Sequence, residues 1–196
     1  QELFKQLDIN GAIIVIHTGY ANLSPLKYRQ EYSKYPIFYY DLDDIRDYSA
    51  KEFINLLQLQ YPKLDKIVVG YDFHFGKEAK YSSDDLKKLF KKNVTVVPEI
   101  SHKGIAVHSR IIRELLKNGD IPLANELLTR AYKIYGTNIK GQGLGSKEFV
   151  PTINLNIDNF LLPKEAIYAT KTTIDNISYN SISFIGHRVT TDNNLQ

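Results

Sequence analysis

Short hydrophobic runs recur along the first half of the chain, and amphipathic segments separate them. The runs are rich in β-branched residues, as is typical of strands buried on both faces of a parallel sheet. Four strands are therefore expected, at 12–17, 37–40, 66–69 and 94–97. Because strands that alternate with helices need crossover connections, this half predicts a doubly wound α/β sheet with ligands at the carboxyl ends of its strands.

Helices are expected between and after these strands. Ser49 and Glu52 have the spacing of a capping box in front of apolar residues that share one helical face, and Pro62 ends that helix. Asp120 is expected to be the N-cap of a later helix. The other helices are predicted at 86–90, 111–116 and 120–128.

The pattern changes in the second half, where apolar and polar residues alternate in part. Strands are predicted at 132–134, 152–157, 168–174 and 178–185, with a turn at Asp175-Asn176. Short strands at this spacing predict a small antiparallel β-barrel. Since the change falls near 129–131, the predicted domains are 1–130 and 131–196.

Composition narrows the class of protein. Hydrophobic residues make up 43% of the chain, which supports a packed core, and the net charge is only +3 with scattered lysines, so no nucleic-acid partner is expected. No apolar run reaches the length of a membrane span and no signal peptide is visible, which indicates a cytoplasmic protein. Cysteine is absent, which excludes disulfides and thiolate chemistry. Methionine is also absent, so we expect that residue 1 is not the natural start.

A glycine-rich stretch carries the strongest candidate chemistry. Gly141, Gly143 and Gly145 alternate, and glycines let backbone N–H groups come close to an anion. Thr152 and Asn154 follow with oxygen ligands that suit Mg²⁺. The spacing is neither that of the phosphate loop nor that of the dinucleotide fingerprint. On the glycines alone, a flexible loop between two strands is the alternative.

A second candidate site follows the third predicted strand. Asp72 can accept a ligand hydrogen bond there, and Phe73 and Phe75 offer stacking faces. The alternative is a turn in which Asp72 caps backbone N–H groups and both rings lie in the core.

A third candidate lies at a predicted helix start. Ser109 is a plausible N-cap, and Arg113 could join the free N–H groups there in holding phosphate. The alternative is that Arg113 is a solvated residue on an exposed helix face.

Several segments resemble one enzyme family, in the family's order. The glycine-rich loop that leads into Pro-Thr-Ile-Asn at 151–154 resembles the flavokinase signature, and Gly-Tyr-Asp-Phe-His-Phe-Gly at 70–76 resembles the adenylyltransferase motif Gly-Phe-Asp-Phe-x-Phe-Gly. Further similar segments lie at 108–113, 128–132, 161–168 and 185–188. Over nearly its whole length the chain resembles the bifunctional riboflavin kinase/FMN adenylyltransferases, the prokaryotic FAD synthetases.

The resemblance implies the fold class α/β + β. A Rossmann-like nucleotidyltransferase domain at 1–130, without its amino-terminal part, would precede a riboflavin kinase-like antiparallel β-barrel at 131–196, without its carboxyl-terminal part. The implied substrates are ATP and the flavins riboflavin, FMN and FAD, with Mg²⁺ as cofactor. The implied site residues are Gly141, Gly143, Gly145, Pro151, Thr152, Asn154, Ser109 and Arg113 for nucleotide, Asp72, Phe73 and Phe75 for flavin, and Thr152 and Asn154 for Mg²⁺.

The chain also departs from the family pattern. His108 and Arg110 stand where the family has serine and threonine, which keeps positive charge but loses a hydroxyl. No catalytic residue is expected within the 196 residues, because the family's His-x-Gly-His precedes a helix that begins like 1–4 and its glutamate base follows the equivalent of 194–196. His17 is interpreted as a loop or core histidine. Little turnover is therefore expected from these residues by themselves.

The main hypothesis is an enzyme that makes FMN and FAD from riboflavin, ATP and Mg²⁺, with small molecules as partners and at most weak self-association. A non-catalytic flavin- or nucleotide-binding module is the alternative. A third hypothesis is a nucleic-acid-binding small barrel, because the 14 tyrosines could stack on bases, but the low net charge argues against it.

Overall fold

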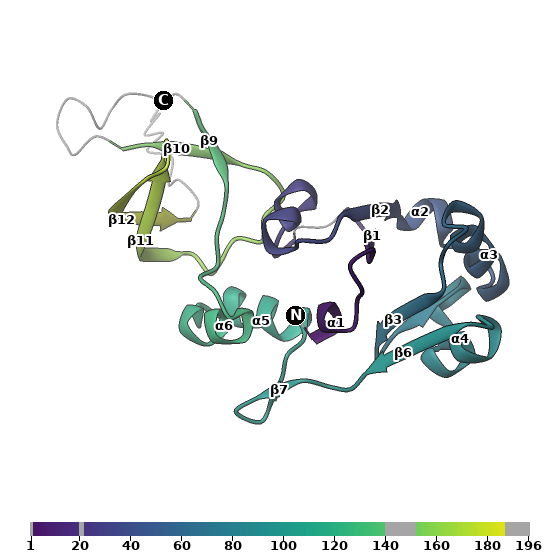
Figure 1. The fold of residues 1–196 in the computed structure, drawn as a ribbon. Helices are drawn as coiled ribbons and strands as arrows, with labels where there is room; N and C mark the ends of the chain where they lie inside the picture. Colours follow the sequence, from purple (N-terminus) through teal and green to yellow (C-terminus); the bar gives the residue numbers. More distant parts are fainter. Residues whose placement is uncertain (1, 20–21, 140–151, 187–196) are drawn as a thin grey trace, which may run out of the picture. The chain divides into compact units, whose positions relative to one another are not determined.

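The computed structural model describes residues 2–19, 22–139 and 152–186 (Figure 1). These residues fall into two compact units, one made of 2–19 with 24–106 and the other of 22–23 with 107–139 and 152–186. The predicted domain boundary after residue 130 stays a prediction. The residues between 107 and 130, which that boundary assigned to the first domain, belong to the second compact unit.

The first unit contains the four strands that the sequence predicts. β1 (Ile13–His17) pairs in parallel with β2 (Ile37–Asp41), and β3 (Lys66–Gly70) pairs in parallel with β6 (Asn93–Val97). Their bounds agree with the predicted ones to within a residue at each end. Among the described residues the strands form two separate parallel pairs, because no described strand joins one pair to the other.

Helix α3 (Ala50–Gln60) confirms the predicted capping box. Ser49 Oγ accepts from the N–H of Glu52 at 3.3 Å, and Glu52 Oε2 accepts from the N–H of Ser49 at 2.8 Å. The helix ends before Pro62, as expected, because proline cannot continue the backbone ladder. Helix α4 (Ser83–Leu89) begins earlier than predicted, since Asp85 accepts from the N–H of Ser82 and caps it there.

The core of this unit lies between α3, α4 and strand β3. Its aromatic and aliphatic side chains come from both helices and from the segment after β3. The buried cluster comprises Ile45, Ala50, Phe53, Ile54, Leu57, Val69, Phe75, Leu86 and Phe90. Leu86 and Phe90 are almost completely excluded from solvent, so they anchor α4 on the sheet.

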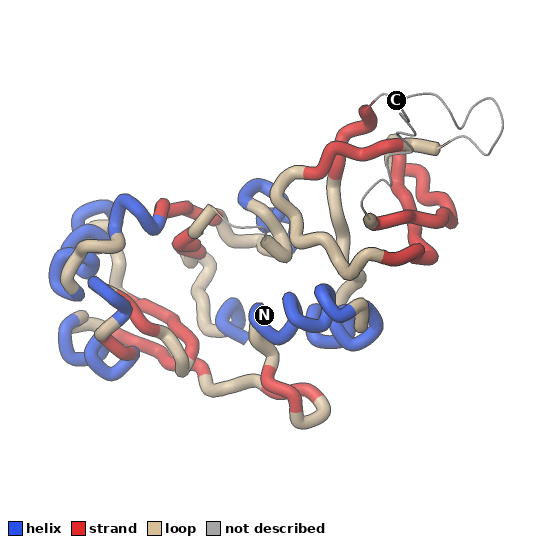
Figure 2. The backbone as a smooth tube through the Cα atoms, turned by 180° about the vertical axis from the view of Figure 1, so that it is seen from behind, coloured by secondary structure: helices blue, strands red, loops and turns tan. Residues whose placement is uncertain are grey.

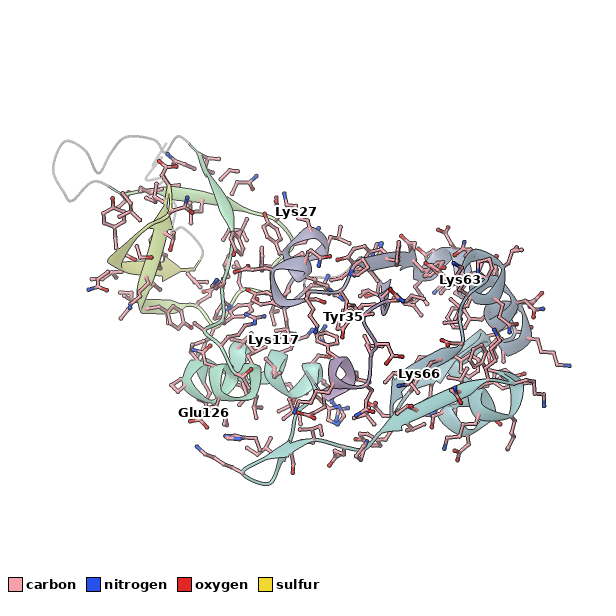
Figure 3. All side chains as sticks on the ribbon, viewed as in Figure 1. Lys27, Tyr35, Lys63, Lys66, Lys117 and Glu126 are labelled. Carbon is pink, nitrogen blue, oxygen red and sulfur yellow. The ribbon has the colours of Figure 1, made fainter. Side chains whose placement is uncertain are left out.

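The amino-terminal segment is tied to the starts of two strands. After α1 (Glu2–Lys5), the backbone carbonyl of Leu7 accepts from Tyr35 Oη at 3.1 Å, and that of Gln6 accepts from Lys66 Nζ at 2.7 Å (Figure 3). Tyr35 precedes β2 and Lys66 begins β3. The segment therefore contacts both parallel pairs at their amino ends.

Smaller elements complete the first unit. Two of them are short hairpins that the sequence patterns did not predict, and one is a single turn that follows β2. They are η1 (Leu26–Tyr32), α2 (Leu42–Ile45), β4 (His74–Phe75) with β5 (Tyr81–Ser82), η2 (Lys77–Ala79), and β7 (Ser101–His102) with β8 (Ile105–Ala106).

The second unit begins with two helices that lie side by side in both views (Figures 1 and 2). Helix α5 (Ser109–Asn118) ends at Gly119, which adopts the left-handed conformation with φ 86°, and α6 (Ile121–Leu128) follows. Asp120 caps α6 as predicted, because its side chain accepts from the N–H of Leu123 at 3.2 Å. The predicted N-cap at Ser109 is wrong by one residue, since His108 holds that position.

The strands of the second unit form two antiparallel ladders. β9 (Gly136–Ile139) pairs with β10 (Asn154–Ile157), and β11 (Ala166–Ile174) pairs with β12 (Ile177–Ile185) (Figure 2). The Asp175-Asn176 turn is confirmed. Both of its residues have positive φ, 49° and 65°, as a two-residue hairpin of type I′ requires. The two ladders are separate in the described residues and are not closed into a barrel.

The predicted strand at 132–134 is wrong. Tyr132 is held instead by two hydrogen bonds outside any strand, since its N–H donates to Asn125 Oδ1 and its hydroxyl to the carbonyl of Leu161, both at 2.7 Å. The first contact takes up the backbone N–H of Tyr132 that a ladder could have used.

Every helix in the described part of the chain falls short of the length and apolarity that a membrane crossing requires.

Candidate functional site

Polar side chains gather where β3 and β6 end. Gly70 is the last residue of β3 and is in register with Val97, the last residue of β6. Immediately beyond them, the Tyr71 hydroxyl donates a hydrogen bond to Glu99 Oε2. Asp72 is exposed, and its Oδ1 lies 3.1 Å from the place where a Cβ on Gly70 would stand. This glycine therefore lets the Asp72 carboxylate fold back onto the strand end.

The hydrogen bond changes the acidity of the phenol. Donation to the Glu99 carboxylate, followed by partial burial and the negative charges of Glu99 and Asp72, raises the pKa of Tyr71 to about 12. Tyr71 is thus a neutral hydrogen-bond donor at neutral pH.

The two phenylalanines of the same segment are placed differently from each other. Phe75 is only 5% exposed, and its ring lies 6.0 Å from that of Phe53 and 5.9 Å from that of Tyr81, between ring centroids. Phe73 is half-buried and stacks on Phe75 at 5.5 Å. For Phe75, the alternative that its ring lies in the core is therefore confirmed. The ring would have to leave the core to stack on a ligand. Flavin binding by Asp72, Phe73 and Phe75 stays a prediction.

A second polar pair lies at the carboxyl ends of β1 and β2. His17 Nε2 and Asp41 Oδ2 are 3.5 Å apart, and these residues are the registered last pair of the two strands. Asp41 also caps α2, because its Oδ1 accepts from the N–H of Asp43 at 3.0 Å. Sequence reasoning missed this pair. Its only signal was that His17 ends one predicted strand and Asp41 directly follows another.

The residues predicted to hold phosphate on α5 lie together. Ser109 occupies the first turn of the helix, and Arg113 Nη1 donates to its Oγ at 3.0 Å. A cation beside the free N–H groups of a helix start can hold an anion. The arrangement fits the predicted role, which stays a prediction.

Thr152 and Asn154 lie at the start of β10. Asn154 is the first residue of β10 and Thr152 precedes it by two residues, and both are exposed. Gly141, Gly143, Gly145 and Pro151 fall outside the described residues, so the loop that they form stays a prediction. Within the described ranges, no cluster of three or more histidine and carboxylate side chains has the arrangement of a metal site.

Comparison with known proteins shows which family the chain resembles. The family model for FAD synthetase matches residues 37–111, and the model for riboflavin kinase matches residues 128–196. The bifunctional riboflavin kinase/FMN adenylyltransferase of Bacillus subtilis is 33% identical over 147 residues, which are 72% of this chain and 46% of the relative.

The chain belongs to the bifunctional riboflavin kinase/FMN adenylyltransferase family. The chain spans about half the length of the bifunctional relatives that it matches. The trifunctional protein RibF/MnmA of Mycoplasmoides gallisepticum is 36% identical over 74% of this chain and 21% of its own length.

A solved structure has a similar fold. A crystal structure described as a macrolide-efflux protein from Streptococcus pneumoniae aligns with a TM-score of 0.70 over 84% of this chain and 61% of its own. At 23% identity this likeness concerns the fold alone. The candidate flavin residues and Ser109 lie within the FAD synthetase match, and Thr152 and Asn154 lie within the riboflavin kinase match.

Proposed function

We propose that the full-length protein makes FMN from riboflavin and FAD from FMN, with ATP as donor and Mg²⁺ as cofactor in both reactions. The observation that carries the proposal is the presence of both family matches, in the order 37–111 and 128–196, on one chain. The bifunctional activity named for the Bacillus subtilis relative supports it. We also propose that the enzyme acts in the cytoplasm.

For adenylyl transfer we place the flavin at the carboxyl end of β3. Asp72 and Phe73 are accessible there, and a phosphate oxygen of FMN would attack the α-phosphorus of ATP. The new oxygen–phosphorus bond forms as the bond to the β-phosphate breaks, and pyrophosphate leaves. Arg113 and the first N–H groups of α5 would hold triphosphate oxygens and offset their charge.

For riboflavin phosphorylation we propose that the strands of the second unit belong to a small antiparallel barrel. The side chains of Thr152 and Asn154 fit Mg²⁺, since they present exposed oxygen ligands two residues apart where the chain enters β10. When bound, the ion neutralises phosphate charge. The glycines at 141, 143 and 145, with Pro151, would hold ATP while a ribityl hydroxyl attacks the γ-phosphorus and ADP leaves.

The test separates the two activities. Full-length protein is supplied with riboflavin, ATP and Mg²⁺, and FMN and FAD are quantified by chromatography. Thr152→Ala should lower FMN formation about 10- to 100-fold while FAD formation from added FMN continues, because a ligand to a charged group is lost in one site only. Arg113→Ala should lower FAD formation from added FMN while FMN formation from riboflavin continues.

Matched controls come from exposed residues elsewhere. Thr173→Ala on β11 and Arg46→Ala, whose guanidinium pairs with Asp43 at 3.0 Å, should change neither activity more than twofold. Absence of any flavin product from the wild-type protein would contradict the proposal. Flavin binding without ATP consumption would favour the non-catalytic binding module instead.

A further inference from the structure

The Tyr71–Glu99 hydrogen bond joins the segment that follows β3 to the segment that follows β6. Register in the β3–β6 pair ends at Gly70 and Val97, and the side-chain contact lies just beyond it. The two residues are 28 positions apart, so only the parallel pairing of β3 and β6 brings them together. The contact therefore extends the pairing past the ends of the strands.

The segment that this contact holds carries the candidate flavin residues. The N–H of Phe73 donates to the carbonyl of Gly70 at 3.1 Å, and His74 Nδ1 lies 2.9 Å from the carbonyl oxygen of Asp72. Phe75, at the far end of the segment, is fixed in the core. Strand β3 and the core thus hold the two ends of the segment. Tyr71 adds a contact to Glu99 in the segment that follows β6.

The hydroxyl of Tyr71 is the group that makes the contact to the Glu99 carboxylate. The phenol keeps its proton at neutral pH, for the electrostatic reasons given above. It is also 42% exposed, so the contact acts at the surface where a ligand would arrive. Core packing alone gives no reason for an aromatic hydroxyl paired with a carboxylate there.

We infer that Tyr71 and Glu99 form a positioning pair that orients Asp72 and Phe73 toward the flavin substrate of the adenylyl transfer. The inference rests on the proposed adenylyltransferase function. Tyr71 acts through its neighbours, so its loss weakens recognition of FMN more than it slows the chemical step. The riboflavin kinase reaction, which is assigned to other residues, does not depend on the pair.

The experiment measures FAD formation from FMN and ATP by the full-length protein. Tyr71→Phe is expected to raise the KM for FMN about three- to tenfold, with kcat and the KM for ATP changed less than twofold. Glu99→Ala should raise the KM for FMN by the same factor as Tyr71→Phe. Glu99→Gln should have a smaller effect, because its amide oxygen still accepts from Tyr71.

Coupling and controls complete the test. The double variant Tyr71→Phe with Glu99→Ala should be no worse than either single variant, since each removes the same bond. Tyr39→Phe, which removes a phenol-to-carbonyl bond of 2.6 Å elsewhere in this unit, should leave the KM for FMN unchanged. Thermal unfolding and riboflavin phosphorylation should match the wild type in all variants.

Three results would overturn the inference: a KM for FMN within twofold of wild type in Tyr71→Phe, equal changes for FMN and ATP, or additive losses in the double variant. In each of them the wild-type protein still makes FAD, so the proposed function survives. A wild-type protein that makes no FAD removes the proposed function and the inference together.

Discussion

At the scale of single residues, Gly70 shows how a missing side chain shapes the candidate site. Its Cα is so close to the Asp72 carboxylate that a methyl group there would contact Oδ1 at 3.1 Å. That distance is shorter than ordinary van der Waals contact. The carboxylate is exposed and can move, so a substitution should displace it rather than unfold the protein.

Gly70→Ala therefore tests whether the position of Asp72 matters. The KM for FMN should rise about threefold, while the free energy of unfolding changes by less than about 0.5 kcal/mol. Asp72→Asn should raise the KM further, since it also removes the charge. Steady-state kinetics and urea unfolding measure the two quantities. An unchanged KM in both variants would show that Asp72 does not contact the flavin.

At the scale of secondary-structure elements, carboxylates at helix starts make the fold sensitive to acid. The side chain and then the backbone of Ser49 hydrogen-bond to Glu52, and they lower its pKa below the ordinary value of 4.5. A carboxyl group whose pKa is lower in the folded state stabilises the fold above the unfolded-state value. That stabilisation is lost as the pH falls through the lower, folded-state value.

Glu52→Gln is expected to weaken this acid dependence, because glutamine keeps the capping geometry but does not titrate. Between about pH 5 and pH 3, the urea midpoint of the variant should fall less than that of the wild type, as followed by circular dichroism. Glu114→Gln, on the exposed side of α5, is the matched control and should retain the wild-type slope. Identical slopes for wild type and Glu52→Gln would rule out the cap as the cause.

The stability of the β11–β12 hairpin depends on the backbone conformation of its two-residue turn. Asn176 has φ 65°, a conformation that glycine adopts without strain. Asn176→Gly should stabilise the second unit by about 0.5 kcal/mol, measured by thermal unfolding. Asn180→Gly, the same change inside β12, should destabilise it because the strand conformation needs no glycine. Equal effects at the two positions would contradict the assigned turn.

At the scale of the whole molecule, the compact units do not coincide with the predicted domains. Helix α5, which carries Ser109 and Arg113, belongs to the same unit as strands β9 to β12. Leu116 on this helix is fully buried, as is Leu86 in the other unit. Ser109 and Arg113, which are proposed to hold phosphate in adenylyl transfer, therefore lie in the same unit as Thr152 and Asn154, which are proposed for the kinase.

This division predicts unequal effects of two matched core substitutions. Leu86→Ala and Leu116→Ala should each destabilise their unit by about 2–5 kcal/mol. On heating, Leu86→Ala should lose adenylylation first, while Leu116→Ala should lose both activities together. Both rates are measured against temperature in the full-length protein. Adenylylation as heat-resistant as wild type in Leu116→Ala would contradict the placement of phosphate binding on α5.

What the sequence determined by itself is the set of elements that depend on neighbouring residues. The capping box at Ser49, the cap at Asp120, the turn at Asp175 and the four strands of the first unit were all predictable, because propensity and periodicity act over a few positions. The two motif regions likewise indicated the family, because each is a short run of neighbouring residues with a characteristic order. The expected burial of the strands is wrong for β1 and β2, which contain no buried residue.

Only the tertiary structure decided which distant groups meet. It placed Phe75 in the core, paired His17 with Asp41 and Tyr71 with Glu99, and used Tyr132 for long-range contacts instead of a strand. These outcomes depend on strand register and packing between segments far apart in the chain. No pattern within one segment contains that information, because a side chain's partners are set by which segments fold against it.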